Sequence, residues 1–159
     1  MLAREMTKSV DRDLSNDEQT QLQTLIAQLN DRERDGADRT NDAHALGEIG
    51  HFGAIGALAR ILRNDEEDIE VRRYCAVALA RIAHKDSVEA LIDVVSHPEI
   101  GLNANESLRR LTGAPLPELG VWRPGPEHRD ERQQLQENWR KWWRTNSTTV
   151  KLNRNSMIF

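Results

Sequence analysis

Apolar residues recur along the chain with the spacing of helices rather than the alternation of strands. Three stretches carry apolar residues at positions i, i+3, i+4 and i+7, which form one stripe along an α-helix. The stripes are Leu22, Leu25, Ile26 and Leu29; then Ile55, Leu58, Ala59 and Leu62; then Val88, Leu91, Ile92 and Val95. Each is displaced from the previous one by 33 residues. The pattern therefore predicts three equivalent amphipathic helices.

The same displacement relates a second set of helices. The matching pairs are Arg39 with Arg72, Ala43 with Ala76, Leu46 with Leu79, Ile49 with Ile82 and His51 with His84. The repeating unit is thus a helix, a tight turn and a second helix, and a looser copy follows over 104–112. A single hairpin of this kind cannot bury its apolar face alone, so successive hairpins are expected to stack.

Helices are predicted over 16–30, 38–50, 54–63, 68–83, 86–96, 98–112 and 127–145. Ser15 with Glu18, and Asp86 with Glu89, have the spacing of a capping box. Pro98 can open a helix in its first turn. The acidic run over 65–70 is expected to be a solvated loop that leads into a helix N-terminus, where negative charge is favoured.

The organisation that follows has five parts. They are an N-terminal extension (1–15), the repeats (16–112), a Pro/Gly-rich loop (113–126), a capping helix (127–145) and a tail (146–159). Trp122 is expected to pin the loop to the body. In the capping helix, an apolar side that closes the open end of the stack is predicted. It consists of Leu135, Trp139, Trp142 and Trp143. The tail lacks periodicity, and either a short strand or disorder is expected there.

The candidate chemistry is sparse. The sequence has no Gly-rich phosphate loop, no GxSxG and no HExxH motif, so no enzyme and no cofactor are predicted. His51 and His84 recur at the turn inside each hairpin, and capping of that turn is favoured over a shared metal ion. Cys75 lies in an apolar helical stretch and is expected to be buried. Without an apolar membrane span or signal segment, a cytoplasmic location is expected, with an exported form lacking its signal peptide as the alternative.

Two stretches resemble a known family. AHALGEIGHFGAIGALARIL and VRRYCAVALARIAHKDSVEALIDVV look like the HEAT-like repeats of phycobilisome-lyase-type and other bacterial repeat proteins. The pattern VRxxAxxALxxI, a turn and VxxLxxxL covers roughly residues 17–112. The resemblance implies an all-α fold: a right-handed α-α superhelix of about three helical hairpins plus a C-terminal capping helix. It also implies that the second helix of each hairpin lines a concave face, where such proteins bind partners.

The candidate partner-binding positions flank the apolar stripe of those second helices. They are Gln23, Asn30, Arg60, Arg63, Glu89 and Asp93. Arg60 and Asp93 occupy equivalent positions on adjacent repeats, and an exposed ion pair worth about 0–1 kcal/mol is expected between them. The mixture of charges favours a protein or peptide partner of mixed charge. The sequence thus predicts a non-catalytic scaffold that binds a protein or peptide.

Two alternatives to the scaffold remain open. The resemblance allows a cofactor-handling protein, either bilin lyase-like or metal-binding. Residues 129–154 hold seven Lys/Arg against three acidic residues, in a chain with a net charge of −4. This basic helix suits nucleic acid, although a solvated helix face is favoured.

Overall fold

A computed structural model describes residues 9–115 and 119–153, and within these ranges the chain is helical and contains no strand. The α-helices are α2 (Asn16–Asn30), α3 (Gly36–Ile49), α4 (Ile55–Arg63), α5 (Ile69–Ile82), α6 (Lys85–Ile92), α7 (Gly101–Thr112) and α8 (Arg129–Asn146). Short 3-10 turns lie at Phe52–Ala54 and Pro126–His128. The prediction of an all-α fold is confirmed.

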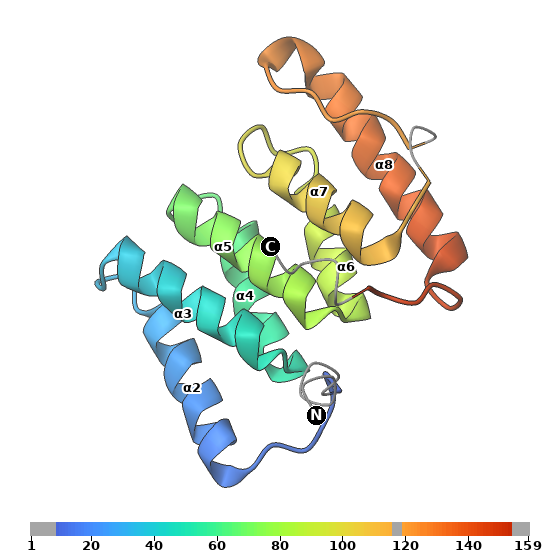
Figure 1. Ribbon diagram of the computed structural model, residues 1–159. Helices are drawn as coiled ribbons and strands as arrows, with labels where there is room; N and C mark the ends of the chain where they lie inside the picture. The colour runs from blue at the N-terminus through green and yellow to red at the C-terminus, as the bar shows by residue number, and fades with distance from the viewer. Residues whose placement is uncertain (1–8, 116–118, 154–159) are drawn as a thin grey trace.

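The helices are arranged as stacked hairpins. Helices α3, α5 and α7 follow one another as the first members of successive hairpins, and α4 and α6 pack behind them (Figure 1). Helix α2 packs against α3 at one end, and α8 lies beyond α7 at the other (Figure 1). This packing is that of a HEAT-like repeat fold, as predicted. The right hand of the superhelix stays a prediction.

Helix starts agree with the sequence at α2 and differ at α6 and α7. Ser15 and Glu18 form the predicted capping box. The predicted box of Asp86 and Glu89 is wrong, because the ring of His84 caps α6: its Nδ1 accepts from the Asp86 N–H at 3.1 Å. Helix α7 begins at Gly101, three residues later than the predicted residue 98. His97 Nδ1 accepts from the backbone N–H groups of Glu99 and Ile100, and these bonds hold a separate turn before the helix.

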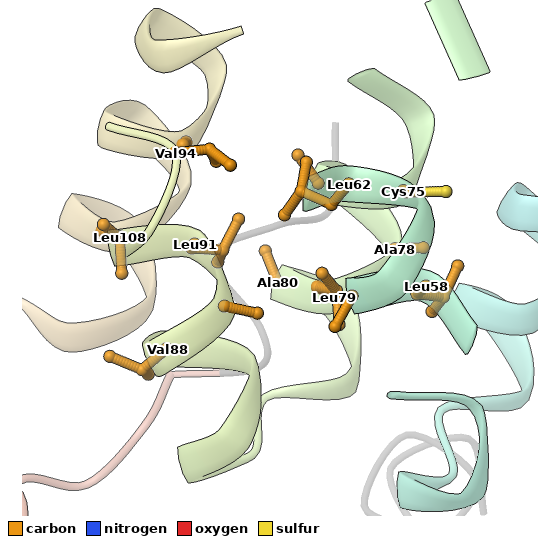
Figure 2. Close-up of a cluster of buried hydrophobic side chains, with 14 of the residues drawn as sticks. Leu58, Leu62, Cys75, Ala78, Leu79, Ala80, Val88, Leu91, Val94 and Leu108 are labelled. Atoms are coloured by element: carbon orange, nitrogen blue, oxygen red, sulfur yellow. The ribbon is translucent and has the colours of Figure 1, made fainter. Parts of the chain in front are cut away.

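The predicted stripes form the core between hairpins. Leu58 of α4, Leu79 of α5 and Leu91 of α6 have no exposed surface and point into one cluster (Figure 2). Cys75 lies in the same core, and burial raises the pKa of its thiol. The predictions for this cysteine and for the second and third stripes are therefore confirmed, whereas Leu25 and Ile26 of the first stripe are only partly buried.

Substitution of Leu58 or Leu91 by alanine should lower the free energy of unfolding by about 2–5 kcal/mol, because each leaves a cavity in a packed core. Urea unfolding followed by circular dichroism measures this. Leu102, which is 46% exposed on α7, provides the matched control. Its alanine variant should unfold within about 0.5 kcal/mol of the parent. Equal losses at a buried and at the exposed leucine would contradict the assignment.

Buried arginines tie α3 to α2 and α5 to α4. Arg39 Nε donates to the Leu29 carbonyl oxygen at 2.8 Å, and Arg72 Nε donates to that of Leu62 at 2.9 Å. Both pairs are related by the repeat. Each guanidinium therefore supplies a partner for one of the carbonyls left over at a helix C-terminus.

The two arginines differ in their acidic partners. Arg39 makes a bidentate pair with Glu67 at 2.7 and 2.9 Å, and both side chains are buried. This pairing lowers the pKa of the Glu67 carboxyl. The expectation that the whole acidic run is solvated is therefore wrong for Glu67. Arg72 instead contacts the exposed Asp65 at 3.1 Å and the His97 ring at 3.2 Å. Burial and the nearby Arg72 lower the pKa of His97.

The ends of the described chain also pack on the stack. Phe52 N donates to the Val10 carbonyl oxygen at 2.8 Å, and Arg12 Nη2 donates to that of Ile49 at 2.9 Å. At the other end, Asn153 N donates to the Leu111 carbonyl oxygen at 2.7 Å. Within 146–153 the expected short strand is not formed, and this part of the tail is instead held against the end of α7. Residues 154–159 of the predicted tail lie outside the described residues.

Candidate binding groove between α4, α6 and α8

A groove lies where the second helices of two hairpins meet the capping helix. It has a volume of about 310 Å³. Its lining residues come from α4, from the C-terminal end of α6 and the residue after it, and from α8. They are Arg63, Glu89, Ile92, Asp93, Arg140, Trp143 and Arg144. The groove thus combines several guanidinium groups and carboxylates with two large apolar side chains.

Helix α8 reaches this position through contacts with α6 and α7. Gln136 Nε2 donates to the Ile92 carbonyl oxygen at 2.8 Å, and Arg132 Nε donates to that of Ser96 at 3.3 Å. Trp139 Nε1 donates to Asn105 Oδ1 of α7 at 2.8 Å. These side chains occupy one face of α8, so the neighbouring face turns Arg140 and Arg144 toward the groove.

The loop before α8 is held as predicted. Trp122 is buried, and its Nε1 donates to the Val95 carbonyl oxygen at 2.8 Å. The Arg132 guanidinium lies over the Trp122 ring, 5.6 Å from its centroid. On α8 itself, Leu135, Trp139 and Trp143 are buried, whereas Trp142 is partly buried and meets Trp139 edge-on. The predicted apolar side of the capping helix is therefore confirmed, with Trp142 at its margin.

Asp93 is the centre of the charged part of the groove. Its Oδ2 accepts from Arg63 Nε at 3.0 Å and lies 2.8 Å from Arg63 Nη2, while its Oδ1 lies 3.5 Å from Arg140 Nη2. The expected pair of Arg60 with Asp93 is not the one that forms. Arg63, almost one turn after Arg60, stands opposite Asp93 instead.

The floor of the groove is apolar and its rim is charged. Ile92 and Trp143 are buried, with 3% and 6% of their surface exposed. The rim side chains of Arg63, Asp93 and Arg140 are 40–47% exposed. Because so little of Ile92 and Trp143 is exposed, an incoming side chain would meet mainly the arginine side chains, whose methylene groups add apolar surface beside the guanidinium donors.

The structure brings together three of the six predicted partner-binding residues. Arg63, Glu89 and Asp93 line the groove. Arg60 is exposed on α4 outside the lining, and within the described ranges no ion pair forms with it. Gln23 lies in a separate polar hollow on α2, and Asn30 is exposed as the last residue of α2.

Sequence reasoning missed the contribution of α8 to this site. Arg140, Trp143 and Arg144 were assigned to a cap and a basic helix face, and nothing in the repeat pattern placed them beside α6. The basic surplus of residues 129–154 was the one signal that marked them.

The histidines at the repeat period cap turns. His51 Nδ1 accepts from the Gly53 N–H at 3.0 Å, as His84 Nδ1 does from Asp86, so the favoured prediction is confirmed. In the part of the chain that the structure describes, no group of three or more His, Cys, Asp or Glu side chains is placed to hold a metal ion. No helix within residues 9–115 and 119–153 is long and apolar enough to cross a membrane.

Together, the stacked hairpins and the groove beside their capping helix define a helical-repeat protein. Residues 71–97, which cover most of α5, all of α6 and the turn after it, match the family model of the PBS lyase HEAT-like repeat. The chain therefore contains a HEAT-like repeat, in agreement with the resemblance seen in the sequence. Neither the curated proteins nor the solved structures gave a match to this chain.

Proposed function

We propose that this protein is a non-catalytic interaction module that binds a protein or peptide partner in the groove between α4, α6 and α8. The carrying observation is the joint presence of a buried apolar floor and a half-exposed charged rim at a seam between rigid helices. Protein interfaces combine these features, with apolar residues at the centre and polar groups at the edge.

The helical framework supports this role because it holds the charged side chains of the rim in place and leaves them partly exposed. Arg63 and Arg140 are anchored on different helices and are held by the shared Asp93. Side chains that are already positioned lose less conformational freedom when a partner binds. The groove is thus suited to recognising a partner without rearranging.

The proposal can be tested by site-specific photo-crosslinking in cells. A photoreactive amino acid at Glu89, in the groove, should give a discrete adduct with another protein. The matched control is Glu48 on α3, which is exposed and lies outside the groove. Asp93→Arg should reduce the adduct from position 89, because it removes the carboxylate that holds two guanidiniums. Equal adducts from both positions, or none from position 89, would speak against the groove.

Because the matched repeat is named after a PBS lyase, a bilin lyase-like role is the alternative function. Protein purified from a bilin-producing host tests it. A visible absorption band that co-purifies with the chain would favour this alternative over the interaction module.

A further inference from the structure

We infer that the groove between α4, α6 and α8 recognises an acidic peptide segment that carries an apolar side chain, rather than a partner of mixed charge. This inference rests on the proposed function and names the chemistry of the partner. Three observations support it: the balance of charge in the groove, the free donors of its guanidiniums and the nature of its floor.

The charge of the groove differs in sign from that of the chain. Three arginines face two acidic residues in its lining, whereas the chain as a whole carries −4. Asp93 is already opposed by Arg63 and Arg140, which leaves Glu89 as the remaining acid of the lining. Within the described ranges, no ion pair forms with Arg144 or with the nearby Arg60. Glu137, outside the lining, also pairs with Arg140, so the positive charge left for an approaching segment is that of Arg144.

The guanidiniums keep donors for a ligand. Arg63 uses Nε and Nη2 toward Asp93, and a guanidinium has five N–H groups in all. Arg140 also contacts Glu137 at 2.7 Å, yet 41% of its side chain is exposed. Planar guanidiniums bind carboxylates in a bidentate manner, and those of Arg63 and Arg140 are already oriented by Asp93. The groove is therefore prepared for the carboxylate of an Asp or Glu side chain.

The groove also offers apolar surface. Ile92 and Trp143 line it but are only 3% and 6% exposed, so a Leu, Phe or Trp side chain would mainly cover the methylene groups of the arginine side chains. A nucleic acid would extend its phosphates beyond the groove, over a chain whose net charge is −4. An acidic peptide with an apolar residue satisfies both the rim and the floor.

A peptide-display selection on the full chain tests this inference. A random peptide library is selected on the wild-type protein and, in parallel, on the Arg140→Glu/Arg144→Glu double variant. Peptides enriched on the wild type should gain Asp and Glu together with an apolar residue relative to the starting library. The double variant should lose this enrichment. Wild-type selection without acidic enrichment, or with basic enrichment, overturns the inference.

Individual peptides then identify the surface. An acidic peptide from the selection should bind the Arg144→Glu variant about tenfold more weakly, which corresponds to about 1.4 kcal/mol. Lys141→Glu is the matched control: it makes the same change of charge on an exposed residue of α8 that does not line the groove. It should bind within about twofold of the parent, since the effect of an exposed charge away from the ligand is screened by salt. Equal weakening by both variants overturns the inference.

A further arm separates peptide from nucleic acid and separates this inference from the proposed function. A single-stranded oligonucleotide should bind more weakly than the acidic peptide at the same salt concentration, and equal or tighter binding overturns the inference. If acidic peptides are not enriched while position 89 still gives its adduct, the partner chemistry is wrong and the proposed function stands. Loss of both signals contradicts both.

Discussion

Replacement of Arg39 by methionine should lower the free energy of unfolding by about 3–5 kcal/mol, the usual loss when one partner of a buried ion pair is removed. Arg39 and Glu67 are both buried and share two hydrogen bonds. Without the guanidinium, the Glu67 carboxylate stays buried with its charge uncompensated, and the Leu29 carbonyl oxygen loses its donor. Urea unfolding followed by circular dichroism measures the loss.

The repeat supplies a matched control for this variant. Arg72 occupies the equivalent position and makes the equivalent bond to Leu62, but its acidic partner Asp65 is 84% exposed. Arg72→Met should therefore cost less, about 1–3 kcal/mol, because Asp65 keeps its hydration when the arginine is lost. The double variant Arg39→Met/Glu67→Gln should recover part of the Arg39 loss. Equal costs at Arg39 and Arg72 would show that burial of Glu67 contributes nothing.

The pH dependence gives an independent readout of the same pair. Arg39 lowers the folded-state pKa of Glu67, so the pair adds stability above the unfolded pKa of about 4.3 and loses it as the pH falls through the lower folded value. In Arg39→Met this contribution is absent, and burial of Glu67 acts in the opposite direction. The difference between parent and variant should therefore shrink as the pH is lowered from 7 toward 4. A difference that does not change with pH contradicts the electrostatic explanation.

Elements set by local pattern were predictable from the sequence. Leu58 and Leu91 are fully buried where the apolar stripe placed them, and Ser15 caps α2 with Glu18. Such features depend on residues within one or two turns, so their spacing along the chain is sufficient. The repeat then multiplied the signal, because the same spacing appears in successive hairpins.

The buried ion pair was not predictable in this way. Arg39 and Arg72 match at the repeat distance, which marks them as equivalent but not as buried. The difference between them comes from Glu67, and the position one repeat later is Ile100. An acidic partner that is present in a single repeat does not recur at the repeat distance, so the sequence pattern does not reveal it. Its role follows from the three-dimensional contact between α3 and the loop before α5.

The part of the groove that comes from α4 and α6 was predictable from the sequence, and the part that comes from α8 was not. Arg63, Glu89 and Asp93 were predictable because they flank a periodic core. The placement of α8 depends on single contacts across a long irregular loop, such as that of Trp122 with the Val95 carbonyl oxygen. A loop without a repeat sets no register, so no sequence pattern placed Arg140 opposite Asp93.

Replacement of Trp139 by alanine should also lower the free energy of unfolding strongly, by about 3–5 kcal/mol, because removal of a fully buried indole leaves a large cavity. It also removes the donor to Asn105, which is itself buried. The side chain joins α8 to α7, so amide hydrogen exchange in α8 should accelerate along with the drop in unfolding free energy. Trp142→Ala provides the control on the same helix and should cost less, because Trp142 is partly exposed in the folded chain.

The Trp139 variant links the stability of the cap to the binding site. Trp139 does not line the groove, yet Arg140, Trp143 and Arg144 reach it only while α8 is docked. Trp139→Ala should therefore weaken binding of an acidic peptide as well as stability, and Trp139→Phe, which keeps most of the ring, should restore a large part of both. Binding that survives the loosening of α8 would mean that α4 and α6 alone hold the peptide, and the share of affinity assigned to the α8 arginines would be wrong.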